Sequence, residues 1–393
     1  MVHFAATQKN HMQPLRAAAL IAAFSLLGVS GLAAQQTYPT PTQGAVFTAP
    51  VQGEDPVGPM GANVAQNQKP VEQDTVAVVD ALPAVAPAVP KKPRRIFVFA
   101  RAKGFVHSNI PLAAYTMKAL GDKTGAWSTT ISYDVADFTA ANLAGYDAIM
   151  LDNTTGAFLD DGDAAATAAR HQALLDFVNS GKGLIMIHAA ADSYHNNGSG
   201  APNRGGFGRR GAGQRGATAA PPSRAQLAAM MRAFANRPKR PYADAPTSTW
   251  PAFSAMVGGW FKWHWTYPQL IHVHLDDTRS PILAGYHGRD FTIHDETYTF
   301  AGFDPKNVHV LTSIDYADMS AADKAKEDMV NPDHFYPLSW LHRVGKGRVF
   351  YQAHGHDEHV YANVPYLEEL LAGTQYALGD LKADDTPGNV KLN

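Results

Sequence analysis

The sequence predicts an α/β fold in which a mostly parallel sheet is covered by helices on both faces. In the first half of the region that is predicted to be ordered, residues 94–380, short unbroken apolar runs alternate with amphipathic segments. Such runs are typical of parallel strands that are buried on both faces. In the second half, strand-like runs follow one another with few helices between them, which indicates extra, partly antiparallel strands.

The first half of this region contains four predicted strands and two predicted helices. The strands are expected at 94–101, 128–134, 146–153 and 183–190. A helix begins near Pro111, which suits a first helical turn, and ends at Gly125. Its cap is expected at Ser108 or Asn109. A second, amphipathic helix is expected within 168–183.

The second half begins with a break in the alternation. Residues 196–224 are rich in Gly and Arg and are predicted to form a flexible insertion, followed by a helix at 225–237. The next stretch, 249–268, is rich in aromatic residues. Five strand-like runs and a last helix complete the region, at 269–275, 291–300, 308–315, 336–345, 347–355 and 365–378.

The N-terminal part has the pattern of an export signal and a linker. Lys9 and Arg16 precede an apolar run, so residues 1–34 are predicted to be a signal peptide. Residues 35–93 are rich in Pro and Ala and are expected to be a disordered or semi-extended linker. One domain at 94–380 and a tail at 381–393 follow. The protein is expected in a bacterial periplasm or secreted, with membrane contact only through an uncleaved signal.

Composition and missing motifs exclude several functions. The formal net charge is −2, so no nucleic-acid-binding surface is predicted. The chain has no cysteine, which excludes disulfides, thiolate ligands and cysteine nucleophiles. It has no G-x-S-x-G elbow and no Walker loop. The G-x-G-x-x-G match at 206–211 lacks the flanking strand and helix that a dinucleotide site needs, so no nucleotide cofactor is predicted.

Polar clusters follow four predicted strands, at the ends where open α/β sheets bind ligands. His107 follows the first strand, and Asp152 and Asn153 follow the third. The stretch 354–359 after the last strand contains three histidines and two carboxylates. The fourth strand ends in a further set of polar residues: His188, Asp192, Tyr194 and His195. Four such clusters at one sheet edge predict one site.

These residue types indicate acid–base catalysis, with or without a divalent metal ion. His354 and His356 share one side if the strand continues through Gly355. Imidazole is the commonest protein metal ligand, and H-x-H at a strand end is a recurrent ligand geometry. If a metal is bound, we expect one ion, with zinc favoured, and the ligands His188, His354 and His356.

An aromatic cluster lies within Trp250–Trp265 and has two interpretations. Aromatic faces beside polar donors suit the C–H faces of sugar rings, which favours Trp263, His264 and Trp265 as substrate-binding residues together with Asp192 and Tyr194. The alternative is core packing, which we expect for at least two of the tryptophans.

Long segments of the chain resemble the trehalose-utilisation (ThuA-like) family. They include GFVHSNIP, GKGLIMIHAAADSY, HDETYTF and GRVFYQAHGHDEHVY, in the family's order across about 94–380. The resemblance implies a flavodoxin-like fold related to class I glutamine amidotransferases. Because the chain has no cysteine at the elbow position, amidotransferase activity is not expected. The positions that carry over are His107, His188, Glu296, His354 and His356.

The resemblance implies a small carbohydrate as partner, and the first hypothesis is therefore a secreted sugar-active enzyme. It would act on an oxidised (keto) disaccharide or related glycoside by hydrolysis, elimination or isomerisation, with His107, His188, Glu296 and His356 as catalytic residues. A second hypothesis is a non-catalytic carbohydrate-binding protein that uses the tryptophan cluster. A third is a metal-dependent hydrolase of a non-sugar substrate.

Overall fold

The structure is a computed structural model that describes residues 66–196, 238–265 and 269–392. The predicted signal peptide, the first part of the predicted linker, nearly all of the Gly/Arg-rich insertion and the helix expected at 225–237 lie outside these ranges. None of the helices in the described part combines the length and the apolarity needed to cross a membrane.

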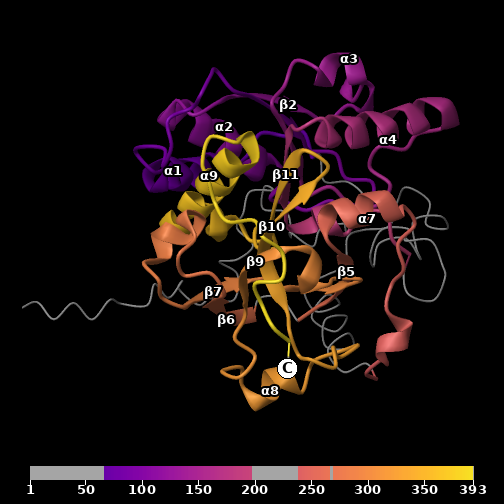
Figure 1. Cartoon of the computed structure of the whole chain (residues 1–393), viewed down its shortest axis with the longest axis vertical. Coiled ribbons are helices and arrows are strands. Elements are labelled where there is room, and N and C mark those ends of the chain that lie inside the picture. The colour runs from indigo at the N-terminus through magenta and orange to yellow at the C-terminus, as the bar shows by residue number, and fades with distance from the viewer. Residues whose placement is uncertain (1–65, 197–237, 266–268, 393) are drawn as a thin grey trace, which may run out of the picture. The chain divides into compact units, whose positions relative to one another are not determined.

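A nine-stranded sheet forms the centre of the fold, in the order β2-β1-β3-β4-β11-β10-β9-β6-β7 (Figure 1). Its strands are β1 (Arg95–Phe99), β2 (Ser128–Ser132), β3 (Ala148–Asp152), β4 (Gly183–Ile187), β6 (Gln269–Leu275), β7 (Phe291–Asp295), β9 (His309–Ile314), β10 (Pro337–Val344) and β11 (Gly347–Gln352). The first five strands in the sheet order are parallel, and the remaining pairs are antiparallel. The predicted α/β fold with antiparallel strands in its second half is confirmed.

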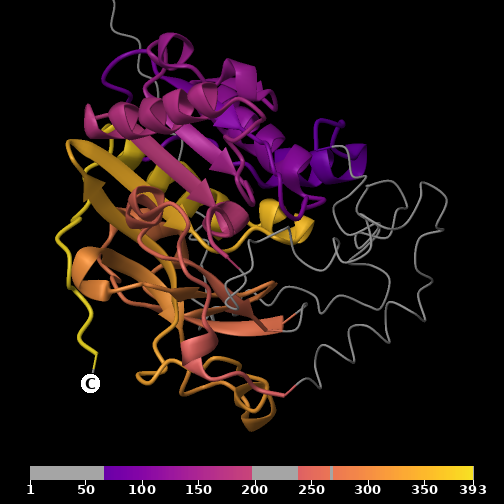
Figure 2. The same ribbon diagram turned by 90° about the vertical axis from the view of Figure 1, so that its right-hand side faces the viewer.

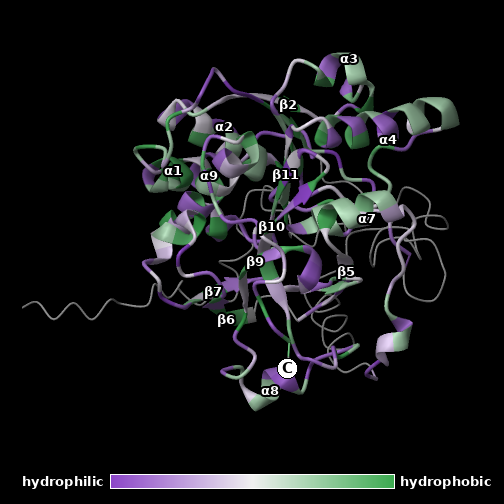
Figure 3. Cartoon of the chain, viewed as in Figure 1, coloured by the Kyte–Doolittle hydropathy of each residue, from purple (hydrophilic) through white to green (hydrophobic). Residues whose placement is uncertain are grey.

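Helices lie on both sides of the sheet, as Figure 1 shows for α2 and α9 on one side and α4 and α7 on the other. The helices are α2 (Ile110–Thr124), α3 (Ala140–Leu143), α4 (Ala164–Asn179), α7 (Pro251–Val257), α8 (Ala321–Lys324) and α9 (Val364–Leu378). Gly125 ends α2 with a left-handed φ of 66°, as predicted. Hydrophobic and hydrophilic residues alternate along α4 (Figure 3) because only one face, with Leu174 and Phe177, is buried.

The segment predicted as a linker contains a helix, α1 (Glu72–Ala81). It contacts α2 and a 3₁₀ turn, η6 (Glu358–Ala362), and Val78 is fully buried there. Upstream of the helix, the side chain of Gln66 accepts a hydrogen bond from Ala102 N at 2.6 Å. The prediction of a disordered or semi-extended linker up to Pro93 is therefore wrong for this part. Docking on the domain stabilises a helix that composition alone does not indicate.

The strand expected at 291–300 is two strands in different sheets. β7 ends at Asp295, and β8 (Tyr298–Ala301) pairs with β5 (Trp260–His264) in a separate two-stranded sheet. Figure 2 shows this small sheet below the parallel strands. The chain leaves the large sheet at Glu296 and Thr297, which places Glu296 at the sheet edge rather than within a strand.

Candidate metal centre

Four side chains converge at one edge of the large sheet: those of His107, His188, Glu296 and His356. Each residue offers one ligand atom, and these atoms all lie within 4.8 Å of one another. They follow β1, β4, β7 and β11 respectively. The ladder directions make these four strands run the same way, so their carboxyl ends meet at one edge. This is where open α/β sheets bind their ligands.

The spacing of three of the four ligand atoms fits a tetrahedral ion. His356 Nδ1 lies 3.1 Å from Glu296 Oε2, and His188 Nε2 lies 3.3 Å from both of these atoms. An ion with bonds of about 2.0–2.1 Å in tetrahedral geometry separates its ligand atoms by about 3.3 Å. The rings of His107, His188 and His356 are nearly perpendicular to one another, with centroids 5.0–5.2 Å apart. The four residues can therefore hold a divalent metal ion.

Hydrogen bonds hold the His188 ring in the orientation that a metal ligand needs. Its Nδ1–H donates to the carbonyl of Ala353 at 2.7 Å, so Nε2 is the nitrogen that faces Glu296 and can serve as the ligand atom. The Tyr351 hydroxyl donates to the His188 carbonyl at 2.6 Å. His188 also has a left-handed φ of 42°, which is rare for a residue with a side chain and directs the chain away from β4. Such strain is found where function requires a fixed side chain.

The carboxylate of Asp295 holds the loop that carries His356. It accepts hydrogen bonds from the backbone N–H groups of Gly355 at 2.7 Å and Asp357 at 2.9 Å. On the other side of the loop, Asn109 and the Tyr361 hydroxyl donate to the Gly355 carbonyl. The orientation of the His356 imidazole is therefore set by groups that are not ligands themselves.

A hydrogen bond joins the loops of His107 and His356. The Ser108 hydroxyl donates to Glu358 Oε1 at 2.7 Å. Nδ1 of His107 is buried and has no hydrogen-bond partner among the described residues. A buried nitrogen without a partner, on a residue of the ligand group, fits a bound group that the chain itself does not supply.

The electrostatics of the site favour a bound cation. Burial opposes ionisation of Glu296, but His264, His356 and His188 outweigh it and hold the pKa of this carboxyl well below its usual range. Burial together with the charges of His356 and His188 lowers the pKa of His107 well below 6.5, so its imidazole is neutral. Burial lowers the pKa of His356, but Glu296 and Asp295 raise it to about 9. An ionised carboxylate and a neutral imidazole are the forms that bind metals, so Glu296 and His107 are in their binding forms, whereas a metal ion must displace a proton from His356.

His264, on β5, lies beside this group. Its Nδ1 lies 2.7 Å from the carbonyl of Trp265 and 3.3 Å from Glu296 Oε1. Both atoms are acceptors, so Nδ1 carries the proton and Nε2 is the nitrogen that can accept one. The side chain of His264 is 21% exposed, against 0% for His188.

His354 is separated from the other predicted ligands. The sequence argument assumed that the strand continues through Gly355, but β11 ends at Gln352 and Gly355 has a φ of +123°. His354 therefore lies in the core, where burial lowers its pKa to about 3 and its Nε2 has no partner among the described residues. His107 and Glu296, predicted as catalytic residues, take the places in the ligand group beside His188 and His356.

The predicted sugar-binding tryptophans are packed inside the protein. Trp263 and Trp265 are buried and contact each other, and Trp265 Nε1–H donates to the Asp323 carbonyl. This agrees with the core-packing interpretation.

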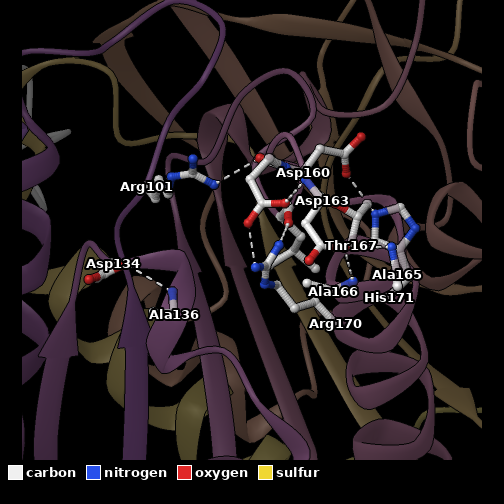
Figure 4. A network of polar contacts seen from close by, with 12 residues as sticks. Arg101, Asp134, Ala136, Asp160, Asp163, Ala165, Ala166, Thr167, Arg170 and His171 are labelled. Carbon is white, nitrogen blue, oxygen red and sulfur yellow. Dashed lines mark hydrogen bonds and ion pairs between the residues drawn. The ribbon is translucent and has the colours of Figure 1, made fainter.

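Tyr194 also lies in a structural network. Its hydroxyl donates to Asp160 Oδ1 at 2.8 Å, and His171 Nε2 lies 2.8 Å from the same oxygen. Figure 4 shows Asp160, which precedes α4, near His171 within the helix and near the capping residue Asp163. The hydroxyl of Tyr194 is therefore engaged by this network rather than by the metal-ligand group.

Asp192 lies one 3₁₀ turn, η2 (His188–Ala191), beyond the ligand His188 and pairs with His195. Sequence reasoning did not single out Asp295, Phe261 or Tyr298, which lie against the ligand group or its neighbours. Only their proximity to Glu296 and His264 in the sequence could have indicated them.

The model of the trehalose-utilisation family (ThuA) matches residues 95–226 and 242–377. The chain belongs to this family. All four residues of the ligand group lie within the matched ranges. Comparison with curated proteins gives no match.

Two solved structures similar to this ThuA-family chain are putative ThuA-like proteins. The one from Bacteroides uniformis is 17% identical, with a TM-score of 0.45, over 74% of this chain and 94% of that chain. The one from Parabacteroides merdae is 15% identical, with a TM-score of 0.41, over 75% of this chain and 93% of that chain.

Proposed function

We propose that this ThuA-family protein is a metal-dependent enzyme that cleaves an oxidised (keto) disaccharide or a related glycoside. The observation that carries the proposal is the convergence of His107, His188, Glu296 and His356 at the sheet edge. Three imidazoles and one carboxylate form a donor set for which zinc is the best fit. Because residues 1–34 have the pattern of an export signal, we propose that the enzyme acts outside the cytoplasm.

The chemistry proposed is proton removal next to a carbonyl, followed by loss of the glycosidic oxygen. A bound divalent ion that accepts the carbonyl oxygen as a fifth ligand would polarise the carbonyl and so acidify the neighbouring C–H group. His264 is placed to accept this proton, because its Nδ1–H is directed at Trp265 and Glu296 and its Nε2 is the acceptor nitrogen. General base catalysis by a positioned imidazole typically contributes about 10²–10⁴-fold to the rate.

The remaining residues of the site fix these groups in place. The Ala353 carbonyl orients His188, and Asp295 orients the loop of His356. Glu296 contacts both His188 and His264, so it joins the ligand group to the proposed base. Positions fixed in this way before substrate binds reduce the reorganisation that the reaction requires.

Metal analysis of protein purified without chelator or affinity-tag histidines tests the centre. We expect one equivalent of divalent metal in the wild type and its loss in His356→Ala. The matched control is His354→Gln, two residues away and outside the ligand group, which should keep the metal. Retention of metal in His356→Ala would contradict the proposed centre.

Turnover of a keto disaccharide and of its unoxidised parent tests the substrate class. We expect cleavage of the keto sugar alone, since only its carbonyl acidifies the neighbouring proton, and loss of turnover in His264→Gln with metal retained. Binding of sugar without turnover would favour the carbohydrate-binding alternative. A metal centre that turns over neither sugar would favour a non-sugar substrate.

A further inference from the structure

A second pair of titratable side chains lies at the same sheet edge, outside the ligand group. His195 Nε2 lies 2.6 Å from Asp192 Oδ1, and His195 Nδ1 lies 2.7 Å from the carbonyl of Asn196. Both side chains are largely buried, at 2% exposure for His195 and 12% for Asp192. Asp192 is the member of the pair that is more open to solvent.

The hydrogen bonds of His195 require an extra proton on this pair. A carbonyl oxygen only accepts, so Nδ1 must carry a hydrogen. The contact between Nε2 and Asp192 Oδ1 is a second hydrogen bond, so one more hydrogen lies between these two atoms. The pair can pass this hydrogen to an acceptor.

Aromatic side chains connect this pair to the metal-ligand group. The ring of Tyr298 lies 4.3 Å from that of His188, and the ring of Phe261 lies 4.5 Å from that of Tyr298. Phe261 in turn lies 5.9 Å from His195 and 6.0 Å from His264. The two rings therefore lie between the ligand group and His264 on one side and the Asp192–His195 pair on the other.

Of these two rings, Tyr298 is buried and Phe261 is partly exposed. An aromatic face flanked by polar groups suits a sugar ring, whose C–H face packs on it while its oxygens reach the polar groups. Phe261, between His264 and His195, is placed to offer such a face.

We propose that Asp192, supported by His195, is the proton donor to the leaving-group oxygen, and that Phe261, backed by the buried ring of Tyr298, forms the platform for the sugar ring between this donor and the metal-ligand group. This inference rests on the proposed function and adds to it the residue that completes the cleavage. Asp192 is given the donor role because it is the more exposed member of the pair.

The step balances without any further reactant. The base takes the proton from the carbon next to the carbonyl, and the electron pair left behind forms a C=C bond. The C–O bond to the leaving group breaks, and its oxygen takes the proton from Asp192. The products are an unsaturated keto sugar and an alcohol, and the pair is left with one proton fewer until the solvent restores it. Nothing is oxidised or reduced overall.

The chain contains a matched control for this pair. His309 Nε2 lies 3.0 Å from Asp277 Oδ2, and His309 Nδ1 lies 2.9 Å from the carbonyl of Thr386. The hydrogen bonding is the same, and exposure is similar at 4% for His309 and 13% for Asp277. Asp277 follows β6 at the end opposite to that of Glu296, because β6 and β7 are antiparallel. The His309–Asp277 pair therefore has the same hydrogen-bonding geometry as the Asp192–His195 pair but lies away from the ligand group.

Two substrates that differ in their leaving group test the role of Asp192. The 3-keto derivative of a 4-nitrophenyl glucoside has a leaving group that departs without protonation, whereas that of a methyl glucoside needs a proton donor. In Asp192→Asn we expect kcat for the methyl substrate to fall by about 10²–10⁴-fold and kcat for the nitrophenyl substrate to change little. His195→Gln should show the same selectivity, and Asp277→Asn should leave both substrates unaffected.

The outcomes separate this inference from the function on which it rests. Equal losses on both substrates in Asp192→Asn, or no loss on either, would overturn the role of the pair while the function stands. Failure of the wild type, with metal bound, to cleave either substrate would overturn both. Metal content and thermal unfolding of each variant show whether the site and the fold are retained.

Discussion

At the scale of single residues, the geometry of the ligand group depends on Asp295, which is not itself one of the four ligand residues. Its carboxylate accepts from the N–H groups of Gly355 and Asp357, on both sides of His356. Asp295→Asn replaces one of the accepting oxygens by an amide that donates, so the loop loses part of its support. Groups of this kind typically affect metal affinity by about 10–100-fold. We expect a loss in this range, measured by competition with a chromophoric chelator.

The control for Asp295→Asn is Asp290→Asn, at the opposite end of β7. Asp290 pairs with His274 on the surface, and both side chains are half exposed. We expect no change in metal affinity there. Equal affinities for wild type and Asp295→Asn would show that the loop keeps its geometry without this carboxylate.

The same scale shows what residue patterns can and cannot predict. Polar residues at strand ends and the family motifs indicated His107, His188, Glu296 and His356. The pattern could not separate His356 from His354, because the difference depends on the left-handed φ of Gly355. Nor could it place Trp263 and Trp265, because an aromatic residue has the same pattern in a core as in a binding site.

At the scale of elements, most strands and helices could be predicted because each has its own local pattern. The helix α1 could not, because it depends on contacts with α2 and η6, which are distant in the sequence. The division of 291–300 into β7 and β8 was also missed, because both halves are apolar and only their partners differ.

The helix α1 provides a test at this scale. Val78→Ala removes two methyl groups from a fully buried site and should lower the free energy of unfolding by about 2 kcal/mol. The neighbouring Val79 is 46% exposed, so Val79→Ala should change it by less than about 0.5 kcal/mol. Chemical denaturation of the two variants measures the difference. Equal values would mean that α1 is not docked in solution.

At the scale of the whole molecule, the site is a product of topology. β11 lies beside β4, and β7 is the last strand in the sheet order. Even so, the carboxyl ends of both strands lie on the same side of the sheet as the carboxyl end of β1. The sequence indicates a parallel first half but carries no local signal for the sheet order. The convergence of four strand ends could therefore be expected from the polar clusters, but the ligand set could not be derived from them.

Stability of the whole domain should depend on pH through several buried carboxyl groups, among them that of Glu369 on α9. Burial raises its pKa from 4.5 to about 7, and the hydroxyls of Tyr286 and Ser339 are uncharged partners that offset this only in part. The folded state therefore binds a proton that the unfolded state releases above pH 4.5. The contribution of the protonated Glu369 carboxyl to stability is fully present below pH 4.5 and is lost as the pH rises towards 7. The free energy of unfolding then decreases by roughly 3 kcal/mol.

Glu369→Gln removes this titration, because an amide has no proton to lose. We expect the wild type to lose stability relative to Glu369→Gln between pH 5 and 8, with the variant the more stable of the two at pH 8. The neighbouring Glu368→Gln is the control and should follow the wild type. Thermal unfolding of the three proteins across this range measures the difference, since the contributions of all other groups are common to them. Parallel curves for wild type and Glu369→Gln would mean that Glu369 is charged in the folded protein and that α9 accommodates the charge.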